Sequence, residues 1–371
     1  MTDPRPPPLP ASSRPGPQQR FPCPNCGAEL VWDPDADAQV CGHCDFRRAV
    51  PKSTATIVER ALEDAASAAR GFGTDARMVQ CGSCGARVTF EGSDTSTDCV
   101  FCGSAAVLSQ DERRNPLRPE SLIPLDVGRD TVRKQFREWT AGMWFRPNAL
   151  KRVDQFQARG VYVPCWTFDA RVHSDWSAES GTYYYVTVMV PMTVNGRTTM
   201  VPQQVRRVDW NPAAGARDDV YDDLLVPASG FVRGDLLTKL GAFDNKALVP
   251  YRPEYLAGWC AEEYRVDLAD GWKHAQALVE AQQAERCGGD VPGDTYRDLR
   301  VANTIRDVRW KHILLPMWTL TYRCNGKPYT VLIHGQTGHV EGDAPISWAK
   351  VLGLVVALIF FFAIVALLAN V

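Results

Sequence analysis

The stretch CPNCGAELVW, residues 23–32, determines how the N-terminal part of this chain folds. It returns 58 positions later as CGSCGARVTF, residues 81–90, and in each half a second Cys-x-x-Cys pair follows after 14 intervening residues. Similarity at a fixed spacing indicates a duplicated unit. The four pairs are Cys23/Cys26, Cys41/Cys44, Cys81/Cys84 and Cys99/Cys102.

A single pair such as CGHC, residues 41–44, occurs both in dithiol redox centres and in metal sites. Two pairs in each half supply four thiolates for one ion, and the glycines that follow the first pairs, Gly27 and Gly85, permit tight turns. We therefore predict two structural Zn²⁺ ions, with these eight cysteines as the metal ligands. Since four thiolates complete a tetrahedron, His43 is expected to face solvent and the ions to have no catalytic role.

The two cysteine units resemble the zinc-ribbon family of the transcription factor IIB and rubredoxin-like type, whose members bind DNA, RNA or protein. Charge distinguishes these partners, because nucleic-acid binding depends on a basic surface. Residues 20–52 hold four basic and five acidic side chains, and residues 75–114 hold four and six. We therefore expect protein partners, with nucleic acid as the alternative.

The first 20 residues contain seven prolines and no apolar run, which predicts a disordered proline-rich N-terminal segment and excludes a secretory signal peptide. The twelve cysteines are thus expected to stay reduced in the cytoplasm. Residues 53–73 have a capping serine and a helical apolar pattern, and we predict a helix there between the ribbons.

The segment from Val351 to Ala369 has no charged residue, and Trp348 and Lys350 precede it. At about 1.5 Å per residue it is roughly 28 Å long, close to the hydrocarbon thickness of a bilayer. A buried core helix is the alternative, but no polar stripe would orient it. The sequence therefore predicts a C-terminal transmembrane helix, with the lipid bilayer as a partner. It also predicts single-pass placement in the inner membrane, with the bulk of the chain in the cytoplasm.

Between ribbons and C-terminus the patterns mix. Apolar spacing predicts helices over 129–145 and 267–288, and Asn-Gly pairs at 195–196 and 325–326 predict hairpins. Pro191 and Pro202 would interrupt a ladder of hydrogen bonds, so the first hairpin is expected at a sheet edge or a bulge. The class expected for this region is α+β with antiparallel sheet.

Two strands share a motif, Pro164-x-Trp166-Thr167 and Pro316-x-Trp318-Thr319, with an arginine five residues after each Trp. An internal duplication is one interpretation of this pattern, and chance is the other.

No catalytic or nucleotide-binding motif occurs in this region, so we expect no enzyme activity. His334 and His339 are read as turn residues and the four scattered cysteines as buried thiols. Residues 129–159 are basic and aromatic, which suits contact with phosphates or lipid headgroups, but the aromatics have the spacing of core residues. An acidic run is read as a solvated loop, with a divalent-cation site as the alternative; its members are Asp218, Asp219, Asp222 and Asp223.

The paired ribbons, YDDLLVPAS (221–229), ALVPYRPEYLAGW (247–259) and the run from Leu314 to Trp348 together resemble a bacterial family of membrane-anchored zinc-ribbon proteins. Such proteins are often labelled as similar to primosomal replication-restart helicases, although this sequence has no nucleotide-binding loop. The resemblance implies flotillin-type or phage-shock-type membrane proteins as partners.

The expected chain is thus a non-enzymatic adaptor that recruits protein partners to the inner membrane, and a membrane-tethered nucleic-acid-binding protein is the alternative. Its expected parts are a disordered proline-rich N-terminal segment (1–20), zinc ribbon 1 (21–50), a helical linker (51–76), zinc ribbon 2 (77–106), an α+β domain (107–345) and a transmembrane anchor (346–371).

Overall fold

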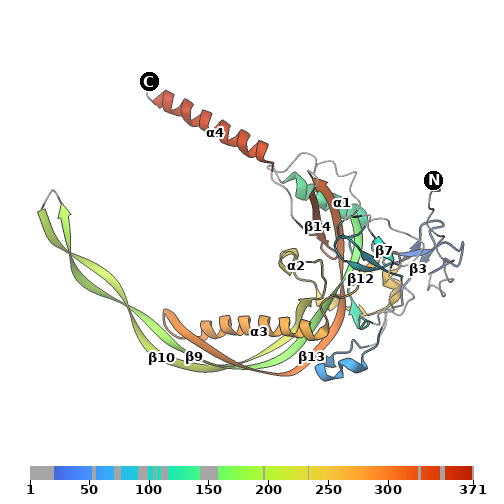
Figure 1. Ribbon diagram of the computed structural model, residues 1–371, viewed down its shortest axis with the longest axis horizontal. Coiled ribbons are helices and arrows are strands. Elements are labelled where there is room, and N and C mark those ends of the chain that lie inside the picture. The colour runs from blue at the N-terminus through green and yellow to red at the C-terminus, as the bar shows by residue number, and fades with distance from the viewer. Residues whose placement is uncertain are drawn as a thin grey trace, which may run out of the picture.

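The computed structural model describes residues 21–51, 56–70, 77–90, 99–102, 104, 107–109, 116–142, 158–194, 197–232, 234–324, 327–342 and 347–369. Three long strands dominate this part of the chain (Figure 1). They are β9 (Ala158–Val194), β10 (Arg197–Pro227) and β13 (Thr295–Cys324), with 37, 31 and 30 residues.

Shorter elements surround the long strands. A separate three-stranded sheet contains β1 (Leu30–Asp33), β2 (Ala38–Cys41) and β3 (Arg47–Arg48). The other strands are β4 (Arg60–Ala61), β5 (Arg77–Cys81), β6 (Arg87–Phe90), β7 (Val107–Ser109), β8 (Ser121–Leu122), β11 (Val249–Pro250), β12 (Cys260–Glu262), β14 (Lys327–His334) and β15 (Val340–Gly342). The α-helices are α1 (Arg129–Ala141), α2 (Gly234–Leu240), α3 (Leu268–Asp290) and α4 (Trp348–Ala369), and the 3-10 helices are η1 (Leu62–Ser67), η4 (Asn245–Ala247) and η5 (Pro253–Leu256).

Both predicted hairpins are present. β9 and β10 pair antiparallel up to Val194 opposite Arg197, and β13 and β14 pair up to Cys324 opposite Lys327. Helices α1 and α3 confirm the two predicted helices, and the Asp267 side chain caps α3 by accepting from the N–H of Asp270.

The expected α+β class is wrong, because the described chain is predominantly β-structure. Strands continue through polar segments that a sequence pattern marks as loops. At three β-bulges an aspartate adopts a positive φ, at Asp223 (53°), Asp298 (53°) and Asp307 (55°), and pairing resumes beyond each one. An aspartate tolerates this backbone conformation, and a bulge bends the strand without ending it.

The inter-ribbon helix predicted over 53–73 is also much reduced. Only Leu62–Ser67 are helical, as a 3-10 helix, and the preceding Arg60 and Ala61 pair with β13 as strand β4. Pairing with a long neighbouring strand overrides a weak helical propensity here. The beginning and the end of the predicted helix lie outside the described residues.

Elements in two parts of the body follow the same order. One unit contains β8, α1, β9 and β10, and the other contains β12, α3, β13 and β14. Each short first strand pairs parallel with the long strand of the other unit, so β8 pairs with β13 and β12 pairs with β9. The long strands β9 and β13 pair antiparallel with each other. These pairings place the units around an approximate two-fold axis.

Individual hydrogen bonds repeat across this axis. The indole N–H of Trp166 donates to the carbonyl of Val266 (2.9 Å), and that of Trp318 donates to the carbonyl of Val127 (2.9 Å). Each tryptophan therefore binds the strand-to-helix connection of the other unit. The carbonyls of both motif prolines also accept in equivalent positions, Pro164 from Ala228 N–H (3.0 Å) and Pro316 from Gly335 N–H (3.1 Å).

The two units differ most in their hairpins, β9–β10 in one and β13–β14 in the other. Beyond Gly181, β13 no longer covers β9, and β9 and β10 continue as a two-stranded ribbon that projects from the body (Figure 1). We call residues 182–209 the arm. It is roughly 40 Å long at about 3.3 Å per residue.

The C-terminal helix α4 extends away from the sheets (Figure 1). Across the part of the chain that the structure describes, none of the helices has the length and apolarity that crossing a membrane requires. The expected transmembrane anchor over 346–371 is therefore wrong, as is the single-pass placement in the inner membrane.

Candidate metal centres and binding arm

The first group of cysteines forms a compact cluster at the edge of the three-stranded sheet. Sγ of Cys23 lies 3.5 Å from Sγ of Cys44, and Sγ of Cys26 lies 3.5 Å from Sγ of Cys41. All four sulfurs lie within 4.8 Å of one another. Zn–S bonds of ~2.3 Å in a tetrahedron place sulfurs about 3.8 Å apart, so this donor set fits such an ion.

The second group has the same arrangement. Its Sγ–Sγ distances are 3.6 Å for Cys81 and Cys102 and 3.6 Å for Cys84 and Cys99. The structure thus brings together all eight predicted ligands, in two clusters that can each hold a metal ion. The exposed His43 belongs to neither cluster, as predicted.

Tight turns position the sulfurs. Gly27 and Gly85 both have φ of 77°, and their N–H groups donate to the carbonyls of Cys23 (2.8 Å) and Cys81 (2.7 Å). These are the positions where the sequence predicts glycine to be required. After the Cys41/Cys44 pair this position is taken by Asp45, with φ of 55° and an N–H that donates to the Cys41 carbonyl (3.0 Å).

In each cluster the turns favour the thiolate, the form that binds metals, at one cysteine in particular, whereas burial and the neighbouring thiols raise the pKa of Cys26, Cys84 and Cys99. The N–H of Phe46 and the side chain of Asn25 lower the pKa of Cys44 to about 6. In the second cluster, burial opposes ionisation of Cys81, but N–H groups of Cys84 and Ser83 outweigh it and lower its pKa to about 7.

The first ribbon is docked on the body through Trp32. Its indole N–H donates to the Leu125 carbonyl (3.2 Å), and its own carbonyl accepts from the indole of Trp259 (3.0 Å). Close approach is possible because residue 258 is glycine, where a Cβ would lie 2.4 Å from Cγ1 of Val31. The ribbon is therefore a fixed part of the molecule.

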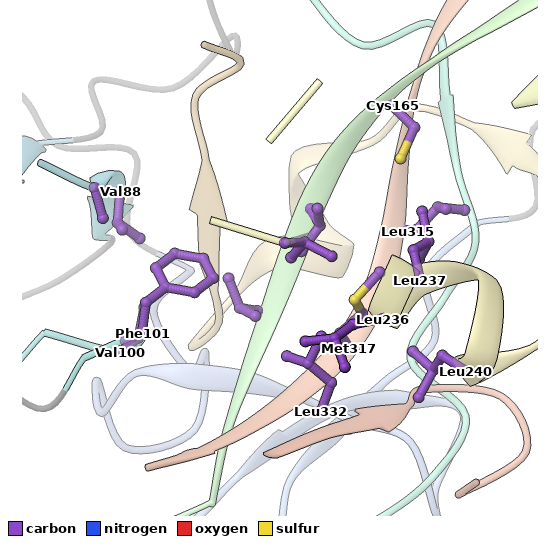
Figure 2. Close-up of a cluster of buried hydrophobic side chains, with 14 of the residues drawn as sticks. Val88, Val100, Phe101, Cys165, Leu236, Leu237, Leu240, Leu315, Met317 and Leu332 are labelled. Carbon is purple, nitrogen blue, oxygen red and sulfur yellow. The ribbon is translucent and has the colours of Figure 1, made fainter. Parts of the chain in front are cut away.

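The second ribbon is continuous with the large sheet, since β6 pairs with β12. The Val100 carbonyl accepts from Thr319 (2.8 Å), and the Phe101 carbonyl accepts from Thr321 (2.9 Å) and Thr330 (3.0 Å). Figure 2 shows Val88, Val100 and Phe101 of this ribbon in one apolar cluster with the leucines of α2. An ion in the second cluster would thus stabilise the core of the body as well as the ribbon.

The acidic residues considered for a cation lie in strand β10, so the expected loop is wrong. Asp218 pairs with His173 (2.8 Å), and Asp219 pairs with Arg217 (2.6 Å) and Arg286 (2.9 Å). Arg217 lowers the pKa of Asp219 to about 2, together with Gln283 and Arg286. Histidine and arginine partners already occupy the carboxylates of Asp218 and Asp219, which disfavours a cation shared by the four aspartates.

The remaining predicted side chains are structural. Nδ1 of buried His334 accepts from the N–H groups of Gln336 (3.1 Å) and Thr337 (3.3 Å), in a turn between strands. Trp139 packs against the core next to Phe136, as its helical spacing predicts, whereas Trp144 and Phe145 lie outside the described residues. Of the four scattered cysteines, Cys165 and Cys287 are buried and Cys260 is half-buried, while the side chain of Cys324 lies outside the described part of the structure.

The sequence analysis did not predict the polar cluster around Lys311. The ammonium group of Lys311, only 6% exposed, pairs with Asp223 (2.6 Å) and Glu59 (2.9 Å). Asp169 lies beside them, and burial together with the neighbouring Glu59 raises its pKa to about 6. The only signal was a lysine inside the apolar run RWKHILLPMW, residues 309–318. Because this network joins Glu59, just before β4, to all three long strands, we interpret it as a structural anchor.

The arm presents apolar side chains to solvent on both faces. Tyr185 and Met189 project from one face, and Tyr184 and Met192 project from the other, each between 45% and 64% exposed. Its acidic and basic residues are few: three arginines and one aspartate in residues 182–209. The arm therefore has the chemistry of a surface for apolar contact.

Prolines interrupt both outer edges of the arm. Pro191 lies opposite Met200, and Pro202 lies opposite Met189. These pairs are two steps apart, so both are of the same kind in the alternating antiparallel ladder, the kind without mutual N–H bonds. The missing N–H groups of Pro191 and Pro202 hence lie on the outer edges, which confirms the predicted edge position and discourages strand addition.

Comparison with known proteins gives one informative similarity. The chain is 26% identical over 342 residues to the uncharacterized protein YdjG of Bacillus subtilis (strain 168), an alignment that covers 89% of this chain and 91% of YdjG. No protein-family model matches the chain, and no solved structure matches it.

Proposed function

We propose that this protein is a non-enzymatic adaptor that captures a protein partner on its arm. The observation that carries this proposal is the set of exposed tyrosines and methionines on a ribbon whose outer edges are blocked. Aromatic and methionine side chains are enriched at the centres of protein interfaces. A projecting two-stranded ribbon gains little stability by itself, so an adhesive surface is a reason for its length.

The low charge of the arm favours protein over nucleic acid. Phosphate contacts depend on many lysines and arginines, and the arm has three arginines against one aspartate. Arg206 is also engaged, since its Cζ lies 4.3 Å from the centroid of the Tyr183 ring. Nucleic-acid binding is therefore the second outcome to test.

The two cysteine clusters serve this adaptor as structural zinc sites. All-thiolate tetrahedral sites are typical of zinc and have no open position for a substrate. Elemental analysis of the reduced full-length protein should give two zinc per chain, and Cys26→Ser and Cys84→Ser should each reduce the zinc content by about one. A zinc content well below two in the wild type would contradict the assignment and would reopen a redox role for the thiols.

The adaptor role is tested by placing a charge on the arm. Full-length wild type, Tyr185→Glu and Met189→Glu are crosslinked in cells, the wild-type partner is identified, and its affinity is measured with purified proteins. The first candidates are the flotillin-type and phage-shock-type proteins that the sequence resemblance implies. We expect at least a tenfold loss of affinity for both variants.

The matched control is Val220→Glu, a side chain 73% exposed on β10 outside the arm. A partner that binds all four proteins equally would exclude the arm as the binding surface. Salt-dependent retention on DNA that Arg206→Gln and Arg207→Gln abolish would instead support the nucleic-acid alternative.

A further inference from the structure

A cavity of about 450 Å³ lies between the first ribbon and the body, far from the arm. Apolar and proline side chains form most of its wall: Phe21, Val58, Pro119, Pro250, Tyr251 and Pro253. Grooves lined by aromatic rings are typical of sites that bind a polyproline II segment, and Phe21 and Tyr251 supply two such rings here. Such a segment binds at a low entropic cost because it is extended before it binds.

The chain itself supplies a segment of this kind. Residues 1–20 contain seven prolines, and they connect directly to Phe21, which is part of the cavity wall. At about 3.1 Å per residue, 20 residues reach up to ~60 Å, so the segment can enter the groove in either direction. A short tether also gives a local concentration of the order of millimolar, at which a weak intrinsic affinity is sufficient.

Carboxylate oxygens in the groove can accept hydrogen bonds from arginines of the segment, although arginines already balance the charge of these carboxylates. Residues 1–20 carry three arginines and one aspartate. The groove contains the carboxylates of Glu120 and Glu254 and one basic side chain, Arg118. Each carboxylate already accepts from an arginine, Glu120 from Arg60 (2.8 Å) and Glu254 from Arg252 (3.0 Å). A carboxylate has about four acceptor sites, so a second arginine can be bound.

We propose that proline-rich residues 4–17 bind in this groove of their own chain as a polyproline II segment. The bound segment covers the seam between the first ribbon and the body. A proline-rich segment of another protein would have to displace it before using the same groove. This inference goes beyond the adaptor role, since it concerns a different surface and does not depend on the arm.

The test uses full-length proteins and a fluorescent synthetic peptide of residues 1–20. In one variant Pro6, Pro7, Pro8 and Pro10 are all replaced by serine, so that the internal segment no longer competes. Fluorescence anisotropy should show that the peptide binds this variant at least tenfold more tightly than it binds wild type. Adding Val58→Glu should abolish binding, and because Val58 is 47% exposed this change leaves the fold intact.

Matched controls are the Val220→Glu change in the proline variant, which should bind as before, and a peptide with serine at every proline, which should not bind. Equal binding to wild type and to the proline variant would overturn the proposal, because the groove would then accept a segment only from another chain. Absence of binding to both proteins, or binding that Val58→Glu does not change, would also overturn it.

Discussion

Glu262 is an acid enclosed in the body, only 1% exposed, on the strand that joins the second ribbon to β9. Its Oε1 accepts from the Ser229 hydroxyl (2.9 Å) and from Gly230 N–H (3.1 Å). Burial raises its pKa to about 7, although these two bonds and Arg265 act in the opposite direction. The folded protein thus pays for ionising this group near neutral pH.

The direction of the pH effect follows from linkage. The pKa of Glu262 lies above its ordinary value of 4.5, so its contribution to stability is fully present below pH 4.5 and is lost as pH rises through 7. Glu262→Gln keeps the acceptor and removes the charge. We expect it to be more stable than wild type at pH 8 by on the order of 1–3 kcal/mol, with no gain at pH 4.5.

Urea unfolding of both proteins at pH 4.5, 6 and 8 measures this effect. Glu120→Gln, at a partly buried ion pair with Arg60, is the control and should not gain stability at pH 8. A difference between Glu262→Gln and wild type that stays constant with pH would show that Glu262 does not titrate in the folded protein.

At the scale of elements, the two units of the body hold each other through Trp166 and Trp318. Replacing either with phenylalanine leaves a carbonyl without its donor, the half-buried one of Val266 or the buried one of Val127. We expect Trp166→Phe and Trp318→Phe to lower the free energy of unfolding by similar amounts, about 1–3 kcal/mol each. Chemical denaturation measures both values, and Trp139→Phe at the half-buried margin of the core should cost less.

Similar costs would support the internal duplication that the shared motif suggests, which remains a prediction about the origin of the chain. If one substitution unfolded the protein and the other had no effect, the two tryptophans would not contribute equally to stability despite their equivalent positions.

Elements whose signal is local could be predicted from the sequence. The cysteine spacing identified both clusters, the Asn-Gly pairs identified two hairpins, and the 3.6-residue period identified α1 and α3. Elements that depend on distant pairing could not. The bulges at Asp223 and Asp307 continue strands where aspartates suggest loops, and β4 forms because Ala61 meets Arg309, some 250 positions later.

At the scale of the whole molecule, a rigid body carries a long, thin extension (Figure 1). Deleting residues 184–191 together with their partners 200–207 removes eight pairs and preserves the face that each remaining side chain occupies. We expect the maximum dimension in small-angle X-ray scattering to decrease by ~25 Å. The thermal midpoint should change little, since these residues lie beyond Gly181, where the pairing of β9 with β13 ends. A large decrease in the midpoint would show that the arm packs against the body.

The docking of the ribbons also sets an order of events during synthesis. The hydrogen bond of Trp32 cannot form until Trp259 has been synthesised, and that of the Val100 carbonyl cannot form until Thr319 has been synthesised. These partners lie 227 and 219 positions further along the chain. At about 5–20 residues per second, a ribosome needs roughly 10–45 s to make that much polypeptide. For most of this interval all four cysteines of each cluster have been synthesised, while the apolar residues beside the cluster have no partner to pack against. Nascent chains are thus the stage at which ion supply and chaperones decide the yield of this protein.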